Sequence, residues 1–341
     1  MFRSSIASLL LLFATAASAD YTVIVPQKVG GGTDVWARIV AKELEQKLGE
    51  RIVIRNIPGI NDVPGFNEFH NKLRKDPKTI MVAHGGNAES FLTQKVDYNY
   101  FEYEPIGLMN LTIVVGKRND VDLTKGIKFA AGSGMNPDVM AITLLMCEPG
   151  KTMQEYLQCY RDKITYVKGM GGGERRMAYL RGELNVTRES TAAYFKHSRK
   201  VPQNQDWFSH GVLDITSGHV KGDSNFEGIS FQEVYEKKWG KKPRGEFYNA
   251  YLLVKMYRDA LQKSLWMDKG NINAQKVSSA LQAVVDDKEA LDRIYQKTGK
   301  YEWIIGKDVD KVTAALQKLT TPKALENLLW FLSNGVGQKT K

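Results

Sequence analysis

The chain has 341 residues, of which 43% are hydrophobic and 25% are charged, and its formal net charge is +10. This composition is that of a folded globular protein with one large or two medium domains, and it excludes a disordered or repetitive chain. No arginine-rich run with interleaved aromatic residues is present, which argues against a nucleic-acid-binding protein.

The first 19 residues, MFRSSIASLLLLFATAASA, have the pattern of a secretory signal peptide. Arg3 precedes an apolar run from Leu9 to Phe13, and small residues end at Ala19. We therefore expect an exported protein that starts at Asp20 and resides in the periplasm. Removal of Arg3 lowers the net charge to +9. A basic exported protein suits an anionic ligand, although surface lysines can also serve solubility alone.

The next hundred residues alternate between strand and helix patterns. YTVIV (21–25) reads as a buried strand, and the following apolar positions recur every four residues on one helical face up to Leu48. Gly49 stands where a helix C-cap belongs. RIVIRN (51–56) and TIMVAH (79–84) predict two more strands with a short helix between them. This βαβαβ order predicts a parallel sheet whose ligands gather at the carboxyl ends of its strands.

The segment 106–120 reads as one long extended stretch and is a candidate crossover between two lobes. A second series of strands, loops and helices follows up to about residue 218. After residue 245 the pattern becomes mainly helical, beginning with 246–266, and we expect this tail to pack back on the first lobe. We place lobe 1 at residues 20–115 plus 235–341, and lobe 2 at 116–234.

Three glycine-rich loops each follow a strand and precede a helix, at 30–34, 132–134 and 169–173. Unpaired backbone N–H groups and the helix dipole favour an anion at such a helix start, and glycine leaves room for the ligand to touch the main chain. The alternative is that these glycines only allow tight turns. Neither a GxxxxGK[ST] motif nor a complete dinucleotide fingerprint is present, because Glu174 occupies the last position of the latter.

Cys147 and Cys159 are the two cysteines of the chain. In an oxidising compartment they can form a disulfide, and two buried thiols are the alternative. Neither a CxxC motif nor a paired-histidine motif points to a metal site. No nucleophile, base and orienting group are marked by spacing, so binding without catalysis is the simpler interpretation. An enzyme on the same scaffold would use Asp34, His84 or Lys168 as its acid or base.

The segment IVPQKVGGGTDVWARIVAKELEQKLGERIVIRNIPG (24–59) resembles the start of the Bug-type receptors, the periplasmic substrate-binding receptors of tripartite tricarboxylate transporters. The matching positions are Pro26, Gly31, Gly32, Asp34, Arg38, Leu48, Gly49, Asn56, Pro58 and Gly59. The resemblance is strong over residues 22–60, weaker to about 218 and faint beyond. Departures occur at Gln27, Lys28 and Val29, where the pocket of this chain is expected to differ from that of the family.

The resemblance implies an α/β, type II periplasmic-binding-protein fold, with two lobes of mixed and parallel sheets joined by crossover strands. It also implies a small carboxylate ligand, held largely by main-chain groups, and delivery to membrane transporter subunits. We expect a monomer that needs no cofactor and no metal. A sensor that passes its closed form to a signalling partner remains an alternative. The candidate ligand-binding residues are Gly30, Gly31, Gly32, Thr33, Asp34, His84, Gly85, Gly86, Asn87, Gly132, Ser133, Gly134, Met135, Gly171, Gly172 and Gly173.

Overall fold

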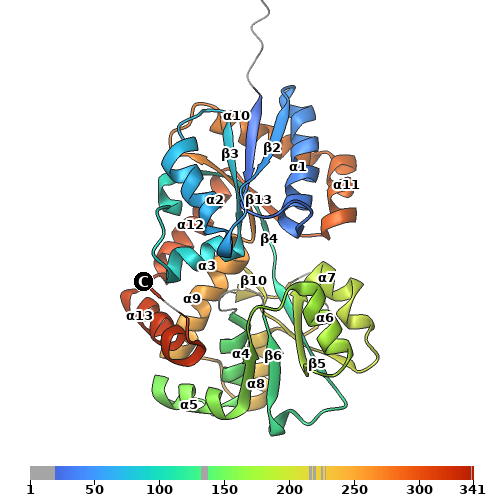
Figure 1. Ribbon diagram of the computed structural model, residues 1–341, viewed down its shortest axis with the longest axis vertical. Coiled ribbons are helices and arrows are strands. Elements are labelled where there is room, and N and C mark those ends of the chain that lie inside the picture. The colour runs from blue at the N-terminus through green and yellow to red at the C-terminus, as the bar shows by residue number, and fades with distance from the viewer. Residues whose placement is uncertain are drawn as a thin grey trace, which may run out of the picture.

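The structure, a computed structural model, describes residues 20–131, 137–214, 217, 220–223, 226, 228–338 and 340–341. The expected signal peptide, residues 1–19, lies outside this part of the chain. Two α/β lobes lie one above the other in Figure 1, and strand β4 and helix α9 lie between them. Among the described residues, no helix combines the length and the apolar character that crossing a bilayer requires.

The first lobe is built on a six-stranded sheet with the order β13-β4-β12-β3-β1-β2. β1 (Tyr21–Val25) lies between β2 (Ile52–Asn56) and β3 (Thr79–His84) and runs parallel to both. These strands and the intervening helix confirm the expected βαβαβ order. The carboxyl ends of all three strands therefore meet at one edge of the sheet, which faces the second lobe.

The other half of this sheet is antiparallel. β12 (Lys263–Asp268) pairs antiparallel with β3 and with β4 (Tyr103–Asn110), and β13 (Glu302–Ile305) closes the edge against β4. The sequence analysis predicted neither β12 nor β13 in the mainly helical tail. Because β12 pairs antiparallel with β3, the amino-terminal end of β12 reaches the same edge of the sheet as the carboxyl end of β3.

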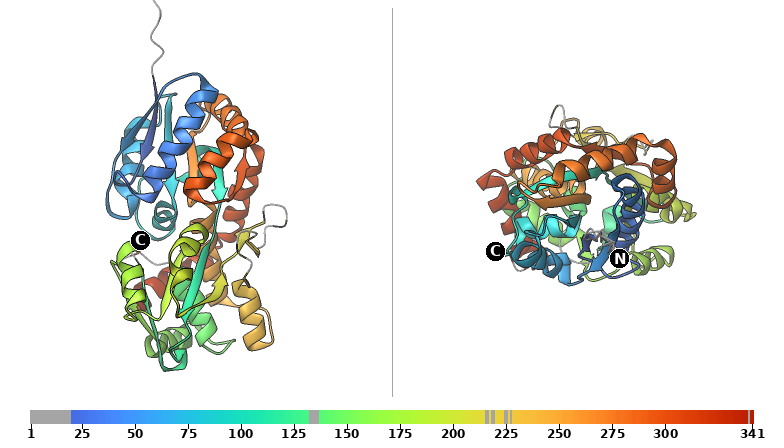
Figure 2. Two further views of the ribbon diagram at one scale, coloured as in Figure 1. Left: turned by 90° about the vertical axis from the view of Figure 1, so that its right-hand side faces the viewer. Right: turned by 90° about the horizontal axis from the view of Figure 1, so that it is seen from above.

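Helices cover both faces of this sheet. α1 (Gly32–Leu48) packs against α10 (Ala274–Asp286) and α11 (Lys288–Thr298), which lie side by side in Figure 2. The buried side chains of Trp36 and Leu44 belong to the core on this face. Gly49 ends α1 in the left-handed conformation, with φ of 67°, as the sequence predicts.

The opposite face is covered by α2 (Val63–Glu68), α3 (Gly85–Thr93), α9 (Glu246–Ala260) and α12 (Lys307–Leu319). Its core continues through α9 into the second lobe without a break. The two lobes are therefore joined by packed side chains as well as by crossing strands.

The chain crosses between lobes where the sequence analysis expected it to, in the segment 106–120. The segment is not one strand, because β4 ends at Asn110 and β5 (Ile113–Arg118) belongs to another sheet. In that three-stranded sheet β5 lies between β8 (Val186–Ser190) and β9 (Asn204–Ser209), antiparallel to both.

A parallel pair of strands, β6 (Ile127–Ala130) and β7 (Ile164–Val167), completes the core of the second lobe. The main helices around these strands are α4 (Pro137–Met146), α5 (Met153–Lys163), α6 (Gly172–Leu180) and α8 (Phe231–Trp239). The shorter elements are the 3-10 turns Ile60–Asp62, Tyr100–Glu102, Leu123–Lys125 and Ser198–Lys200, the π-helical turns Phe69–Leu73 and Leu332–Val336, helix α7 (Thr191–Lys196) and the strand pair β10 (Val212–Leu213) and β11 (Val220–Lys221).

Cys147 and Cys159 form a disulfide, with 6.1 Å between their Cα atoms. The bond links the residue that follows α4 to the middle of α5. Of the two alternatives from the sequence, a disulfide and two buried thiols, the structure thus shows the disulfide.

The carboxyl-terminal tail differs from the expectation in two ways. The helix expected over 246–266 ends at Ala260, because the backbone from Lys263 onward pairs with β3 and β4 instead of continuing the helix. α10 and α11 do pack on the first lobe, whereas α13 (Pro322–Phe331) packs against α9 and α5. The division of the chain into lobes at residues 115 and 235 stays a proposal.

Candidate functional site

A cleft lies between the two lobes, at the carboxyl ends of the parallel strands. It consists of two adjoining hollows of about 780 Å³ and 440 Å³, which share Gln27, His84, Gly172, Arg175, Arg176, Ser190, Ala193 and Gln262 in their walls. The shared residues come from both lobes, so a ligand in this cleft would touch both.

The first glycine loop contributes Gly30, Gly32 and Thr33 to the wall of the larger hollow. Gly30 has a φ of 80°, a conformation that favours glycine, and Gly31 is the N-cap of α1 with no side-chain cap. The first N–H groups of an α-helix have no hydrogen-bond partner within the helix. Those of α1 lie at the rim of this hollow. This placement is what the sequence analysis expected of the loop.

Asp34 holds this loop in shape. Its carboxylate accepts hydrogen bonds from Gly30 N at 2.8 Å, from Asn56 Nδ2 at 2.8 Å and from Arg38 Nε at 3.0 Å. Burial alone would raise the pKa of Asp34, but these three partners outweigh it and lower the pKa. Gly31 N also bonds within the loop, to Lys28 O at 3.1 Å. Asp34 and Gly31 thus build the loop and are absent from the cleft wall.

The second loop, at the end of β3, places His84 and Gly86 in the cleft wall. His84 Nδ1 lies 2.7 Å from Asp62 Oδ2, and Gln27 Nε2 donates to the same carboxylate at 3.1 Å. Burial lowers the pKa of His84 more than the neighbouring Asp62 raises it. His84 is therefore a neutral side chain near pH 7, held by Asp62.

Gly85 and Asn87 have structural positions beside these residues. A Cβ on Gly85 would lie 2.1 Å from Gln262 Oε1 and 2.9 Å from the main chain of Arg258, so glycine is needed for the contact of α3 with α9. Asn87 is fully buried, and its side chain accepts from His84 N at 2.7 Å and donates to Asp62 O at 3.2 Å.

The loop before α6 contributes Gly171 and Gly172 to the smaller hollow, opposite the first two loops. Glu174 accepts a hydrogen bond from Gly171 N at 2.8 Å, which closes the helix start. Gly173 does not line the cleft and instead lines a separate hollow with Met170 and Met177.

The remaining predicted residues, Gly132, Ser133, Gly134 and Met135, lie outside the described part of the chain. Of the predicted residues that are described, those brought together in the cleft are Gly30, Gly32, Thr33, His84, Gly86, Gly171 and Gly172. That these residues contact a ligand stays a prediction.

The sequence analysis missed the basic side chains of the cleft. Arg175 from α6, Arg188 from β8 and Arg258 from α9 all line the smaller hollow. Arg188 Nε donates to Asp138 Oδ2 at 2.9 Å, and Arg258 Nη1 donates to Glu89 Oε2 at 2.6 Å. Three elements that lie far apart in the sequence therefore bring guanidinium groups to one end of the cleft.

Lys263 is the corresponding cation of the larger hollow. It is the first residue of β12, and its Nζ donates to Thr33 Oγ1 at 2.6 Å beside the first glycine loop. Burial lowers the pKa of Lys263 to about 7, although Asp62 opposes this shift. No carboxylate of the described residues forms an ion pair with it.

One signal for these residues was present in the sequence. Arg175 and Arg176 follow Glu174 just after the glycines of GMGGGERRM, so a cation at that helix start could have been predicted. Lys263 and Arg258 gave no such signal, because they stand in a segment whose pattern predicts helix alone. The place of Lys263 in the cleft depends on the pairing of β12 with β3, whereas Arg258 belongs to α9.

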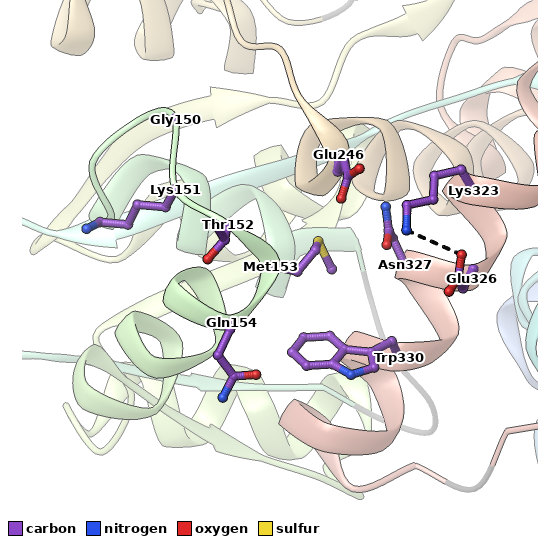
Figure 3. A pocket seen from close by; sticks show the side chains of 10 residues that line it. All are labelled: Gly150, Lys151, Thr152, Met153, Gln154, Glu246, Lys323, Glu326, Asn327 and Trp330. Atoms are coloured by element: carbon purple, nitrogen blue, oxygen red, sulfur yellow. Dashed lines mark hydrogen bonds and ion pairs between the residues drawn. The ribbon is translucent and has the colours of Figure 1, made fainter.

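A separate hollow of about 600 Å³ lies away from the cleft, between the start of α5, the start of α9 and α13 (Figure 3). Its wall contains Trp330 and Met153 together with two lysines and two glutamates, of which Lys323 and Glu326 form an ion pair at 3.4 Å. None of the sequence-predicted site residues lines it. Within the described ranges, no group of three or more His, Cys, Asp or Glu side chains could hold a metal ion.

Comparison with known proteins identifies the fold. No protein-family model and no curated protein matches the chain. Similar solved structures include the periplasmic binding protein BugD, with 16% identity, a TM-score of 0.57 and coverage of 93% of this chain and 98% of that chain.

Two further similar structures contain a ligand. Rpa4515 of Rhodopseudomonas palustris, solved with adipate, has 13% identity and a TM-score of 0.61, and MatC of the same organism, with bound malate, has 15% identity and a TM-score of 0.53. Each alignment covers 91% of this chain and 97% of the other. At such identities the likeness concerns the fold, and it confirms the two-lobed α/β architecture of a periplasmic binding protein.

Proposed function

We propose that this protein is an exported solute-binding receptor that captures a small carboxylate in the cleft between its lobes and delivers it to a tripartite tricarboxylate-type membrane transporter. The observation that carries the proposal is the composition of the cleft wall. Among the described residues, two glycine-rich helix starts and seven lysine or arginine side chains line the cleft together with two carboxylates, Asp62 and Glu189.

Main-chain and side-chain groups in the cleft favour the same ligand. The uncapped start of α1 offers backbone N–H groups to an oxyanion, and the helix dipole adds to their attraction. Lys263 lies next to that start, and Arg175 extends from the facing lobe. A carboxylate placed between them would meet donors from both lobes, which would favour a closed form of the molecule.

Two further observations support a transport role. The first is the secretory pattern of residues 1–19, which would place the receptor in the periplasm. The second is the resemblance of residues 24–59 to the Bug-type receptors, together with a fold shared with BugD and with proteins solved with adipate and malate. Transporter subunits are the partners that such a receptor would serve.

The three acid–base candidates of the enzyme alternative do not form a catalytic group. The carboxylate of Asp34 is occupied by Gly30, Asn56 and Arg38, and its lowered pKa makes it a poor base. Lys168 is exposed, and its Nζ lies 3.5 Å from Gly337 O. A receptor without catalysis therefore fits these positions better than an enzyme does.

The proposal is tested by isothermal titration calorimetry of the mature protein, residues 20–341. The panel is malonate, succinate, malate, glutarate, adipate, citrate and benzoate, with argininamide and acetamide as controls that carry no carboxylate and have positive or zero net charge. We expect saturable 1:1 binding of at least one carboxylate and no binding of argininamide or acetamide. Absence of saturable binding across the panel would contradict the proposal.

A further inference from the structure

The end of the second lobe that points away from the first lobe carries a group of cations that ligand capture in the cleft does not use. The turn after α8 is its densest part, because the nine residues EKKWGKKPR, from Glu236 to Arg244, contain five cations and one carboxylate. Gly240 ends α8 there in the left-handed conformation, with φ of 66°, and all five cations are exposed at the surface.

Lysines from two other elements join this turn around a hollow of about 350 Å³. Lys117, near the end of β5, lines the hollow together with Lys238 of α8. Lys163, the last residue of α5, donates from its Nζ to the main-chain oxygen of Met146 in the hollow wall, at 3.0 Å. Partial burial of Lys238 and the positive charges of Lys163 and Lys117 lower its pKa. Three ammonium groups from distant parts of the sequence therefore lie close enough to repel one another.

The carboxylates of this region do not balance its cations. The set that we call the basic end consists of the cations Lys117, Arg118, Lys163, Lys237, Lys238, Lys241, Lys242 and Arg244 and the carboxylates Asp120, Asp122, Asp162 and Glu236. Within the described part of the chain, Arg118 is the one cation of the set with an ion pair, which it forms with Asp120. Glu148 and Asp206, which adjoin hollow residues in the chain, each pair with a cation outside the set. The basic end thus has eight cations against four carboxylates.

Two tryptophan rings lie next to lysines of the basic end. Lys117 Nζ lies 5.7 Å from the ring centre of Trp207, and Lys238 Nζ lies 4.9 Å from the ring centre of Trp239. Both side chains are half-buried, and Trp239 Nε1 donates to Leu144 O at 3.3 Å. A partly exposed indole has an apolar body and a polar edge, which suits the boundary between water and lipid.

The basic end lies away from the cleft. Ile113, at the start of β5, lines the cleft, and Lys117 follows four residues later on the same strand, about 13 Å away. α8 begins beside the cleft end of that sheet, where Ser230 bridges to Ser209, and its other end shares the hollow with Lys117. Figures 1 and 2 show α5 and α8 at the end of the second lobe opposite the first lobe. A partner bound there would leave the cleft open.

We propose that the basic end binds the surface of an anionic phospholipid bilayer and so holds the receptor beside the membrane, independently of its carboxylate ligand. Lys237, Lys241, Lys242 and Arg244 lie outside the hollow wall, so the charge extends over a broader surface than a small anion would cover. Such lysine clusters are attracted to anionic lipids.

The residue types of the basic end favour lipid over an acidic protein as the partner. Six of its eight cations are lysines, and lysine is depleted at protein–protein interfaces, where arginine is enriched. A lysine ammonium is a point charge on a flexible stem, without the fixed geometry of a guanidinium. It can therefore follow lipid phosphates that move within the plane of a bilayer.

The test is co-sedimentation of the mature protein, residues 20–341, with vesicles at about 0.1 M salt, where the Debye length is about 10 Å. One set of vesicles contains phosphatidylglycerol and phosphatidylethanolamine in equal parts, and the other contains phosphatidylcholine alone. We expect at least about tenfold stronger partitioning to the anionic vesicles, because several lysines near the surface add their attractions. At about 1 M salt the Debye length is about 3 Å, and the difference should vanish. Equal partitioning to both sets at the lower salt would overturn the inference.

Two variants with the same loss of charge locate the contact. The first carries Lys237→Gln, Lys238→Gln, Lys241→Gln and Lys242→Gln. The second carries Lys42→Gln, Lys269→Gln, Lys288→Gln and Lys318→Gln, at exposed lysines of the first lobe that form no ion pair among the described residues. We expect the first variant to bind anionic vesicles at least about tenfold more weakly than the unaltered protein, and the second to stay within about threefold. Equal losses would show that net charge alone attracts the protein, and would overturn the inference.

This inference and the proposed function fail separately. A protein that binds carboxylates but prefers neither set of vesicles keeps the proposed function and loses the membrane contact. A protein that binds anionic vesicles through the basic end but binds no carboxylate does the opposite. If the first variant does not fold, as judged by circular dichroism, the vesicle preference of the unaltered protein and its salt dependence decide the inference.

Discussion

The cleft between the lobes and the hollow between α5, α9 and α13 differ in charge far more than in size. The second hollow, at about 600 Å³, lies between the two parts of the cleft in volume, yet its two lysines are balanced by two glutamates. In the cleft, seven cations face two carboxylates, and helix starts add further N–H donors. Volume alone would have made the two regions equal candidates. What distinguishes the cleft is its excess of positive charge, part of which buried carboxylates hold in place.

The largest expected effect concerns the buried ion pair behind the cleft. Arg188→Ala would leave Asp138, which is fully buried, without its main partner. We expect the free energy of unfolding to fall by about 3–5 kcal/mol, measured by urea denaturation. The matched change in the second hollow, Lys323→Ala, removes an exposed pair and should cost less than about 1 kcal/mol. Equal losses in the two variants would remove the distinction between the regions.

A somewhat smaller effect is expected from the disulfide next to the second hollow. The double variant Cys147→Ala and Cys159→Ala opens a short loop, and we expect a loss of about 3 kcal/mol in the free energy of unfolding. Ligand affinity should stay within about twofold, because neither Cys147, which follows α4, nor Cys159, in α5, lines the cleft. A large loss of affinity would show that the two regions are coupled.

Lys263 gives the cleft a pH dependence that the second hollow should not share. Burial lowers its pKa to about 7, and a bound anion would raise the pKa in the complex. Binding therefore takes up a proton above pH 7, and we expect affinity to fall by up to about tenfold per pH unit from pH 7 upward. Calorimetry between pH 5.5 and 9 measures this fall.

Lys263→Met tests the assignment of this pH dependence. The variant should bind more weakly at pH 6 and should show no fall in affinity between pH 7 and 9. His84 already has a lowered pKa and stays neutral across that range, so it should not replace the effect. A fall that persists in the variant would point to another titrating group in the cleft.

The smallest expected effect is that of Trp330→Ala in the second hollow. Trp330 lines that hollow beside Asn327 and Lys323 (Figure 3) and is not among the residues that line the cleft. Calorimetry should give a carboxylate affinity within about twofold of the unaltered protein. A loss as large as that of a cleft variant would make this hollow part of the binding function.

Local patterns in the sequence were enough to predict the first half of the first lobe. β1, α1, β2 and β3 follow from apolar periodicity, and Gly49 marks the end of α1 as expected. The glycine loops at 30–34 and 169–173 also lie where the sequence places them, at helix starts that face each other across the cleft.

What the sequence did not predict depends on contacts between distant segments. The residues after Ala260 continue a helical pattern, and only pairing with β3 and β4 makes them the strand β12. That pairing carries Lys263 into the cleft beside Thr33, which lies 230 positions earlier in the chain. This position of Lys263 has no local signature. Asp34 accepts hydrogen bonds that shape the loop, and its contact with a ligand stays a prediction.

The most direct test is a crystal structure of the mature protein with the tightest-binding carboxylate of the panel. We predict electron density for the ligand in the cleft, with a carboxylate group at the start of α1 near Thr33 and Lys263. Density in the hollow of α5, α9 and α13 instead, or a ligand in the cleft that contacts neither Lys263 nor Arg175, would contradict this account.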